Sequence, residues 1–480
     1  MFRRSSAVLI GVLLLAPLAA AANSNSLQGQ SWLDHYHNDI KPWFTHPTAL
    51  GEPVGNFPTF RDLTGAPNEQ LRYTRMLSRQ IFTYAMGYQL TGDPELLRLA
   101  YAGKDWLQQH AQHEQGGYYP QLDESGEVVP AQMQTAQDQA YSLVGLSALY
   151  AVSRDPEAKA EMDEMRELML RGPYWDEDNG TILDALDPSY TQPLEFAQPG
   201  NDLVSVVDQL NGYLLLYFNQ NPNLNERKVL LREIRTLADR LVNGFWQDGI
   251  FWDTDINRSD FNAPHVDIGH TIKSYWLLSE VDRYWAETFG GNPYRQLVNN
   301  FGSKVLAAAF NKSTGAWNMR FAGRFDATTN PNPDWWPFCE ANQFGSRLAL
   351  DDGKWVSVLK KTGDFWLNGS FIDRGRAIRG IREGIKGDGS LWGDVDGWNS
   401  KQNQWKNGYH ETEHAVIMYL MSQARSKQPA ALYFAVPLTQ LFSFKPQPYL
   451  FRGEAYKLEP LAYLEDLGLV QVRVTFRNIR

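Results

Sequence analysis

Two histidines at the starts of predicted helices, together with one arginine, are the residues of this sequence that could do chemistry. His270 and His410 each lie at the start of a helical stretch, and the ordinary pKa of histidine, about 6.5, allows one ring to be neutral and another protonated near pH 7. In a ring of helices, both imidazoles could face one pocket as base and acid. Arg79 keeps its charge and suits a developing oxyanion. A histidine on an aromatic-rich helix is more often a packed core residue, and Arg79, four residues after Arg75, could instead form a surface ion pair.

Tryptophan is frequent, with 16 residues, and several of them fall in predicted loops or at helix starts. Sugar rings stack on such aromatic faces. We expect a pocket wall of Trp335, Trp336 and Trp405, with hydrogen bonds from Tyr141 and Tyr409. Packing in the core is the alternative for any one of these rings.

Charged side chains near these aromatic residues allow more than one chemistry. Glu340 and Asp208 could bind sugar hydroxyls, whereas Asp138 and Asp208 could form the two-carboxylate pair of a glycoside hydrolase or unsaturated-uronate hydrolase. Lys273, one turn after His270, would favour the neutral imidazole, or it could bind an anionic sugar such as a uronate. A solvated lysine on a helix face is the simpler interpretation of Lys273.

Residues 410–414 match H-E-x-x-H, the helical zinc site of metalloproteases. The third ligand of such a site is normally a later glutamate or histidine, but the next one, Glu454, falls in a strand-like tail. The surrounding helices also lack the sheet that supports such enzymes. We therefore predict no metal ion and no other cofactor.

The composition is that of a globular protein. Of 480 residues, 43% are hydrophobic and 21% charged, enough to bury a large core. The formal net charge is -10 and basic residues are scattered, which argues against nucleic acid as a partner. Cys339 is the only cysteine, so an intrachain disulfide and multi-cysteine metal sites are excluded.

Residues 1–22 have the order of a secretory signal peptide. Two early arginines precede an apolar run over 7–18 and small residues over 19–22. We predict cleavage after Ala21 or Ala22 and a periplasmic or secreted protein. No later stretch is long and apolar enough for a membrane helix, so we expect no membrane insertion after cleavage.

Apolar residues recur with helical spacing from about residue 29 to about residue 425. Loops rich in glycine, proline, asparagine and aspartate divide this region into twelve predicted helices. They cover 29–43, 69–92, 94–112, 134–153, 155–171, 202–220, 224–244, 267–288, 292–311, 334–348, 351–371 and 409–425. Several form close pairs, as where Gly92 ends one helix and Pro94 opens the next.

A loop with aromatic residues beside glycine recurs between the helix pairs. It is found at 116–119, 172–175, 243–246, 314–317 and 389–392. A spacing of about 60 to 75 residues fits one helical hairpin and a loop per repeat, or six hairpins. We predict a closed (α/α)6 barrel over 23–428, with an open solenoid as the alternative.

The tail, 429–480, changes character. Strand-like runs cover 432–436, 449–456 and 470–476, separated by proline and glycine. We predict a small β extension that covers the edge of the barrel and takes no part in chemistry.

Seven short motifs, in order, resemble the N-acylglucosamine 2-epimerase superfamily, which includes cellobiose 2-epimerases and mannose isomerases. They lie at 40–44, 55–58, 78–84, 137–141, 268–278, 335–341 and 405–410. The strongest is 268–278, which is similar to the family pattern Gly-His-x-Ile-Glu-x-x-Trp-Leu-Leu. Together the motifs span most of residues 30–425.

The resemblance implies an (α/α)6 barrel that moves a proton at C2 of an aldose or an aldose-terminated oligosaccharide. It implies His270 and His410 as the acid-base pair and Arg79 as the group that holds the ring or enediolate oxygen. Two positions depart from the family. A family His-x-x-Glu reads Asp208-Gln209-Leu210-Asn211 here, and Lys273 replaces the glutamate three residues after His270.

These departures leave two alternatives open. The same fold hosts glycoside and unsaturated-uronate hydrolases, and export favours that activity because polymers are met outside the cytoplasm. The second alternative is a saccharide-binding protein that has no catalytic activity and takes part in polysaccharide export. A saccharide is the expected ligand in every case.

Overall fold

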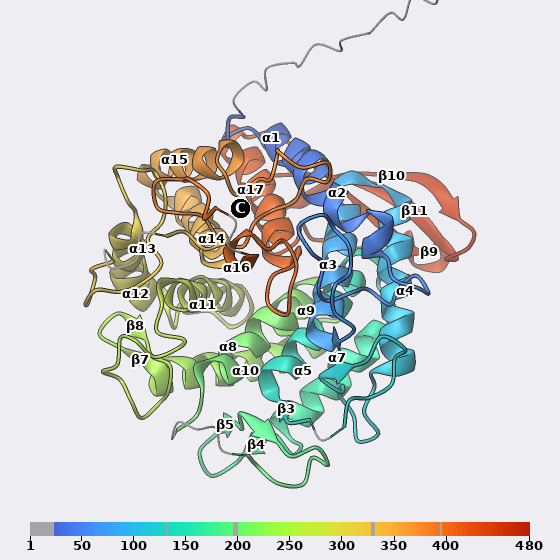
Figure 1. Ribbon diagram of the computed structural model, residues 1–480, viewed down its shortest axis with the longest axis horizontal. Coiled ribbons are helices and arrows are strands. Elements are labelled where there is room, and N and C mark those ends of the chain that lie inside the picture. The colour runs from blue at the N-terminus through green and yellow to red at the C-terminus, as the bar shows by residue number, and fades with distance from the viewer. Residues whose placement is uncertain (1–23, 131, 195–199, 328–331, 394–395) are drawn as a thin grey trace, which may run out of the picture.

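The structure is a computed structural model that describes residues 24–130, 132–194, 200–327, 332–393 and 396–480. The chain runs once around a closed ring of helices (Figure 1). The predicted signal peptide, residues 1–22, lies outside the described residues. Among those described, no helix is both long and apolar enough to cross a membrane.

The helices form an inner and an outer layer (Figure 1). The inner helices are buried on nearly all sides, because they pack both on one another and on the outer layer. They are α3 (Thr74–Thr91), α5 (Ala136–Ser142) with α6 (Val144–Ser153), α8 (Leu203–Gln209) with η3 (Leu210–Leu214) and α9 (Leu215–Gln220), α11 (Ile268–Phe289), α14 (Trp335–Asp351) and α17 (Tyr409–Ser426).

The outer helices bury one face and expose the other. They are α1 (Gly29–His35) with η1 (Tyr36–Ile40) and α2 (Lys41–Phe44), α4 (Pro94–His110), α7 (Pro156–Leu170), α10 (Leu224–Arg240) with η4 (Leu241–Phe245), α12 (Arg295–Leu297) with η5 (Val298–Gly302) and α13 (Ser303–Ala309), and α15 (Lys354–Asn368). Outer and inner helices alternate along the described chain. The predicted (α/α)6 barrel is therefore confirmed.

The predicted break between the second and third helices is also confirmed. α3 ends at Thr91, and Gly92 follows with a φ of 71°, which glycine adopts without steric cost. α4 then begins at Pro94, and the Asp93 carboxylate accepts a hydrogen bond from the backbone N–H of Glu95.

The two ends of the barrel are joined directly. The backbone N–H of Ser26 donates to Asp364 Oδ1 at 2.9 Å, and that of Ser24 donates to Asn368 Oδ1 at 2.9 Å. Both acceptors belong to α15. Trp32 of α1 is fully buried and packs on His414 of α17, so the first hairpin closes the ring against the last.

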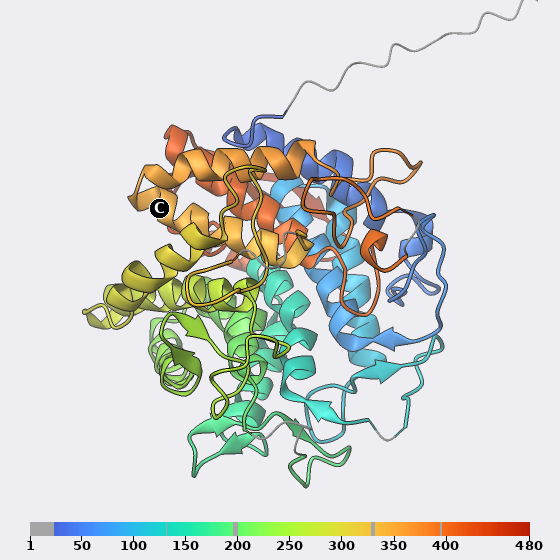
Figure 2. The same ribbon diagram turned by 60° about the vertical axis from the view of Figure 1, so that its left-hand side comes forward.

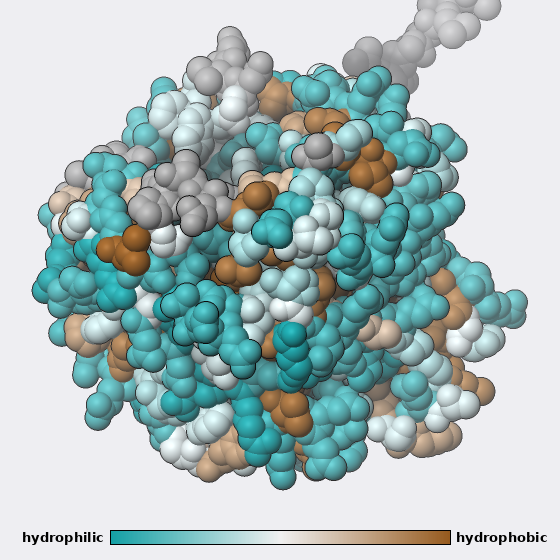
Figure 3. Space-filling model, turned by 90° about the horizontal axis from the view of Figure 1, so that it is seen from below, coloured by the Kyte–Doolittle hydropathy of each residue, from teal (hydrophilic) through white to brown (hydrophobic). Residues whose placement is uncertain are grey.

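Loops and two-stranded ribbons precede the inner helices. Figure 2 shows the long loops near residues 45–70 and 370–393 on the same side of the ring. The ribbons are β1 (Arg72–Tyr73) with β2 (Gln121–Leu122), β3 (Gln134–Thr135) with β6 (Ala185–Leu186), β4 (Trp175–Asp176) with β5 (Thr181–Ile182), and β7 (Trp246–Gln247) with β8 (Ile250–Phe251); the short helices are η2 (Pro47–Ala49) and α16 (Asp396–Asn399). Seen from below, the surface is mainly hydrophilic, with hydrophobic residues in small separate groups (Figure 3).

The C-terminal residues form a small antiparallel sheet, as predicted. Its strands are β9 (Ala430–Pro437), β10 (Glu454–Leu464) and β11 (Leu469–Arg477), in the order β10-β11-β9. β9 packs on α3 and α6. The strand predicted over 449–456 was misplaced: it begins only at Glu454, and Tyr449 lies in a turn with a φ of 54°.

The segment between η6 (Leu438–Gln440) and β10 lies against the C-terminal halves of the inner helices. The carbonyl oxygen of Tyr449 accepts from Gln220 Nε2 at 3.0 Å, and that of Leu450 accepts from the Tyr284 hydroxyl at 3.3 Å. The Arg347 guanidinium lies 3.8 Å from the centre of the Phe451 ring. This segment covers one end of the barrel, and the long loops surround the other.

Close packing of the first two helices gives a stability test. A Cβ at Gly87 would lie 1.7 Å from the hydroxyl oxygen of Tyr36, which is buried. We expect Gly87→Ala to lower the free energy of unfolding by about 3 kcal/mol, because overpacking outweighs the better helix propensity of alanine. Gly353 has open space around it and a φ of -59°, so Gly353→Ala is the matched control and should be nearly neutral. Equal effects of the two changes in urea unfolding would contradict this packing.

Candidate active site

A cavity of about 290 Å³ lies at the N-terminal ends of the inner helices. Helix N-termini carry unpaired N–H groups and partial positive charge, so this end of the ring favours negative charge. Its walls are formed by Arg79, Gln137, Tyr141, Asp208, His265, His270, Lys273, Asp334, Trp335, Trp336, Glu383, Trp405 and His410. Most residues predicted from the sequence are therefore brought together; Asp138, Glu340 and Tyr409 are not part of the wall.

The two predicted histidines share one tryptophan. The ring of Trp336 lies 4.6 Å from that of His270 and 5.9 Å from that of His410, measured between centroids. His270 belongs to the first turn of α11 and His410 to the first turn of α17. Two imidazoles far apart in the chain thus line one cavity.

His270 is held by the residue that caps its own helix. Asp267 accepts from the backbone N–H of His270 at 2.7 Å, and its other oxygen lies 2.6 Å from His270 Nδ1. Burial acts to raise the pKa of Asp267, but the contact with His270 lowers it below its ordinary value. A charged Asp267 favours a proton on Nδ1, which leaves Nε2 for proton exchange.

His410 has a different environment. Burial lowers its pKa well below the ordinary value, and the positive charges of Arg79 and Lys273 act in the same direction. Its Nδ1 lies 3.3 Å from Glu340 Oε1, and burial raises the pKa of Glu340 to about 7. Glu340 thus lies behind the imidazole, and Tyr409 packs beside it with 4.5 Å between ring centres.

Lys273 is not a solvated lysine, so the simpler interpretation is wrong. Its Nζ donates to Asp208 Oδ1 at 2.5 Å, and both side chains are buried. Asp208 also accepts from Tyr141 at 3.0 Å and from Gln137 at 2.9 Å. Burial opposes both charges, yet the pair raises the pKa of Lys273 and lowers that of Asp208. Asp208 and Lys273, which both depart from the family pattern, therefore balance each other's charge.

Arg79 does not form the surface ion pair that the sequence allowed. It is buried, and its guanidinium lies 3.9 Å from the centre of the Tyr141 ring. Its NH1 donates to the carbonyl oxygen of Trp405 at 3.2 Å, and within the described residues its Nε has no hydrogen-bond partner. Its positive charge is available at the cavity wall.

Asp138 lies outside the cavity wall. One carboxylate oxygen lies 2.5 Å from Arg75 NH1, and the other accepts from the Thr135 hydroxyl at 2.8 Å. Because Asp208 is bound by Lys273, both carboxylates of the hydrolase alternative already have buried cationic partners. Neither is free to act as a general acid.

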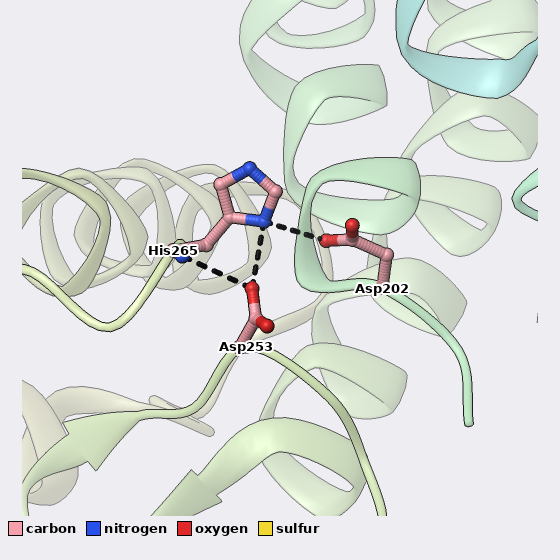
Figure 4. A group of neighbouring side chains, drawn as sticks. All are labelled: Asp202, Asp253 and His265. Carbon is pink, nitrogen blue, oxygen red and sulfur yellow. Dashed lines mark hydrogen bonds and ion pairs between the residues drawn. The ribbon is translucent and has the colours of Figure 1, made fainter. Parts of the chain in front are cut away.

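His265 was not predicted as a site residue, yet its ring lies 5.0 Å from that of His270. Its Nδ1 lies 2.8 Å from Asp253 Oδ1 and 3.0 Å from Asp202 Oδ1 (Figure 4). Burial lowers the pKa of His265, but the two carboxylates raise it to about 10, so the ring is an imidazolium at neutral pH. The same three groups are spaced as potential metal ligands. No motif surrounds His265 in the sequence.

Asp334 and Glu383 were also missed. Burial and the neighbouring Glu383 raise the pKa of Asp334 well above its ordinary value, and burial raises that of Glu383. Both line the cavity, and a raised pKa favours the neutral carboxyl form, which can donate a hydrogen bond to a ligand.

The H-E-x-x-H histidines do not face each other as zinc ligands would. His414 Nε2 lies 2.9 Å from Asn342 Nδ2, and its ring packs against Trp32 and Trp366. In the described part of the chain, the side chains whose possible metal-ligand atoms lie within 4.8 Å of those of His410 are instead Glu340 and Glu413.

Comparison with known proteins decides the family. The family model of N-acylglucosamine 2-epimerase (GlcNAc 2-epimerase) matches residues 55–351. The chain belongs to this family. It is thereby a carbohydrate epimerase or isomerase, as the sequence motifs implied. No curated protein sequence matches it.

Solved structures show the same fold. Cellobiose 2-epimerase from Spirochaeta thermophila DSM 6192 superposes with a TM-score of 0.68 at 16% identity, covering 83% of this chain and 97% of that one. Cellobiose 2-epimerase from Bacillus thermoamylovorans B4167 gives 0.67 at 16% identity, with 82% and 99% covered. A D-mannose isomerase gives 0.65 at 18% identity, with 83% and 98% covered.

The buried pair beneath the cavity gives a stability test. We expect Lys273→Met to lower the free energy of unfolding by about 3–5 kcal/mol, because Asp208 is left charged and unpaired in the interior. The double variant Lys273→Met/Asp208→Asn should recover most of this loss. Arg98→Met removes the exposed pair with Asp466 and should leave the stability nearly unchanged. A double variant as unstable as the single one in urea unfolding would contradict the pairing.

Proposed function

We propose that this protein catalyses proton transfer at C2 of an aldose or an aldose-terminated oligosaccharide, giving the 2-epimer or the ketose. The observation that carries the proposal is the placement of His270 and His410 in one cavity, where both rings contact Trp336. Family membership supports the same reaction class.

The two imidazoles would divide the proton transfers. Neutral His410 or His270 removes the C2 proton of the open-chain sugar, which leaves an enediolate. Return of a proton to the opposite face of C2 by the other imidazole gives the epimer, and protonation at C1 gives the ketose. Asp267 fixes the ring of His270 through Nδ1.

Positive charge would stabilise the enediolate. Arg79 is buried at the wall, and the N-terminal ends of the inner helices point at the same space. Trp335, Trp336 and Trp405 offer aromatic faces for sugar rings, and Trp405 is 47% exposed. The wall therefore suits a polar, ring-bearing ligand.

Hydrolysis is less well supported than proton transfer at carbon. The two aspartates suggested for a glycosidase pair are engaged, Asp208 with Lys273 and Asp138 with Arg75, so that only Asp334 and Glu383 of the wall would remain for such a pair. A saccharide-binding protein without activity would bind sugars in the same cavity and exchange no proton.

Deuterium exchange distinguishes these activities. We expect NMR spectra of monosaccharides, disaccharides and uronates in heavy water to show deuterium at C2 with the wild-type protein. His270→Asn and His410→Asn should each slow this exchange about 10²–10⁴-fold, because each removes one proton-transfer group. His37→Asn changes an exposed histidine and serves as the control.

Other outcomes would assign the other functions. Shortening of an oligosaccharide without exchange would indicate hydrolysis, and sugar binding without either reaction would indicate a binding protein. Exchange that survives both histidine substitutions would remove the proposed pair.

We further propose that the protein is exported to the periplasm or beyond the cell. The support is the order of residues 1–22 in the sequence, with a basic start, an apolar run and a small-residue end. N-terminal sequencing of protein from a cell fraction outside the cytoplasm should begin at residue 22 or 23. An intact N-terminus in the cytoplasmic fraction would contradict export.

A further inference from the structure

Three potential metal ligands meet beside the cavity. Ligand atoms of Asp202, Asp253 and His265 all lie within 4.8 Å of one another. His265 lines the cavity, and its ring lies 5.0 Å from that of His270 between centres. The proposed proton transfers use none of these three side chains.

The backbone holds the three side chains together. Asp202 caps α8, because its Oδ1 accepts from the backbone N–H of Val204 at 3.0 Å. The N–H of Leu203 donates to the carbonyl oxygen of Asp253 at 2.8 Å, which joins the start of α8 to the segment after β8. The N–H of His265 donates to Asp253 Oδ1 at 3.0 Å. These backbone contacts fix the relative positions of the three side chains.

The Nδ1 atom of His265 points between the two carboxylates (Figure 4). It lies 2.8 Å from Asp253 Oδ1 and 3.0 Å from Asp202 Oδ1, yet this buried atom forms no hydrogen bond within the described residues. A ring N–H aimed between two oxygens is poorly aligned with each of them. A metal ion on the axis of the Nδ1 lone pair would contact both oxygens.

The spacing of these atoms fits a six-coordinate ion. Neighbouring ligands of an octahedral ion, each about 2.1 Å from the metal, lie about 3.0 Å apart. Ligands of a tetrahedral ion at the same distance from the metal lie about 3.4 Å apart. The separations of 2.8 Å and 3.0 Å between Nδ1 and the two oxygens match the octahedral case.

Charge and donor type favour a divalent transition metal ion. Asp202 and Asp253 supply two negative charges, which a divalent ion balances, whereas a proton on His265 balances one of them. Mg²⁺ and Ca²⁺ prefer oxygen ligands throughout. An imidazole nitrogen beside two carboxylates suits Mn²⁺ better.

We propose that Asp202, Asp253 and His265 bind a six-coordinate divalent metal ion of the Mn²⁺ type at the edge of the cavity. The ion takes the place of the proton on Nδ1, which leaves to solvent. It joins the start of α8 to the segment before α11, which carries His270. The sequence predicted no metal ion, since the three ligands come from separate segments and no motif marks them.

Binding of Mn²⁺ tests this site directly and needs no sugar. In protein prepared with a chelator and then dialysed, we expect one Mn²⁺ to bind per chain, counted from the electron paramagnetic resonance signal of the free ion. In crystals soaked with manganese chloride, the anomalous difference peak should lie within about 2.2 Å of Nδ1 of His265 and of one oxygen of each aspartate.

Substitution of the ligands gives a second readout. His265→Asn and Asp253→Asn should each weaken Mn²⁺ binding more than about 10-fold, because each removes one ligand. Asp260→Asn changes an exposed aspartate in the same loop as His265 and is the matched control, with unchanged binding. Mn²⁺ should raise the Tm of the wild-type protein and of Asp260→Asn, but not that of His265→Asn. Circular dichroism without metal shows whether each variant is folded.

Three results would overturn the proposal. One is a wild-type protein that binds no Mn²⁺ at millimolar concentration, and another is equal binding by a folded His265→Asn variant. The third is an anomalous peak at Glu340, His410 and Glu413, the other group with ligand-like spacing in the described chain. The inference goes beyond the proposed function, so a failure of the C2 exchange experiment would leave the metal site supported.

Discussion

Charge buried at the N-terminal ends of the inner helices is the constraint on which this site depends. Groups there are removed from bulk water, so each charge needs a partner or must be neutralised. Lys273 is paired with Asp208, His265 with Asp202 and Asp253, and His270 with Asp267. His410 is held neutral instead. Arg79 is the exception, because it keeps its charge without a carboxylate partner in its described surroundings. A bound enediolate would meet the unbalanced charge of Arg79.

Lys273 and Asp208 are both departures from the family pattern, and they lie far apart in the sequence. Their pairing in the structure shows that the two departures are connected. Their side chains come from α11 and α8, and a lysine at one position requires an acid within reach at the other. Lys273 is not a free cation that could bind an anionic sugar, because its charge is already paired with that of Asp208. It does keep positive charge near His410, which helps to hold that imidazole neutral.

Much of the fold could be predicted because local signals and the tertiary structure agree. Helical periodicity and breaks such as Gly92 to Pro94 predicted the helices of the barrel. The repeated glycine-aromatic loops predicted that the helical hairpins close into a ring. The family motifs contain most of the residues that line the cavity. His265, Asp334 and Glu383 carry no local pattern, and only the closed ring places them together. Tyr449 was assigned to a strand from its β propensity, whereas contacts with helix ends fix it in a turn.

The proposed reaction requires that one bound sugar lies between the two imidazoles. A crystal structure of the protein with a sugar alcohol, which imitates the open chain and cannot react, tests it most directly. We predict that C2 of the ligand lies between His270 Nε2 and the ring of His410, each on its own face of the carbon, with an oxygen on Arg79. A ligand bound elsewhere, or one with both imidazoles on the same face of C2, would contradict the account.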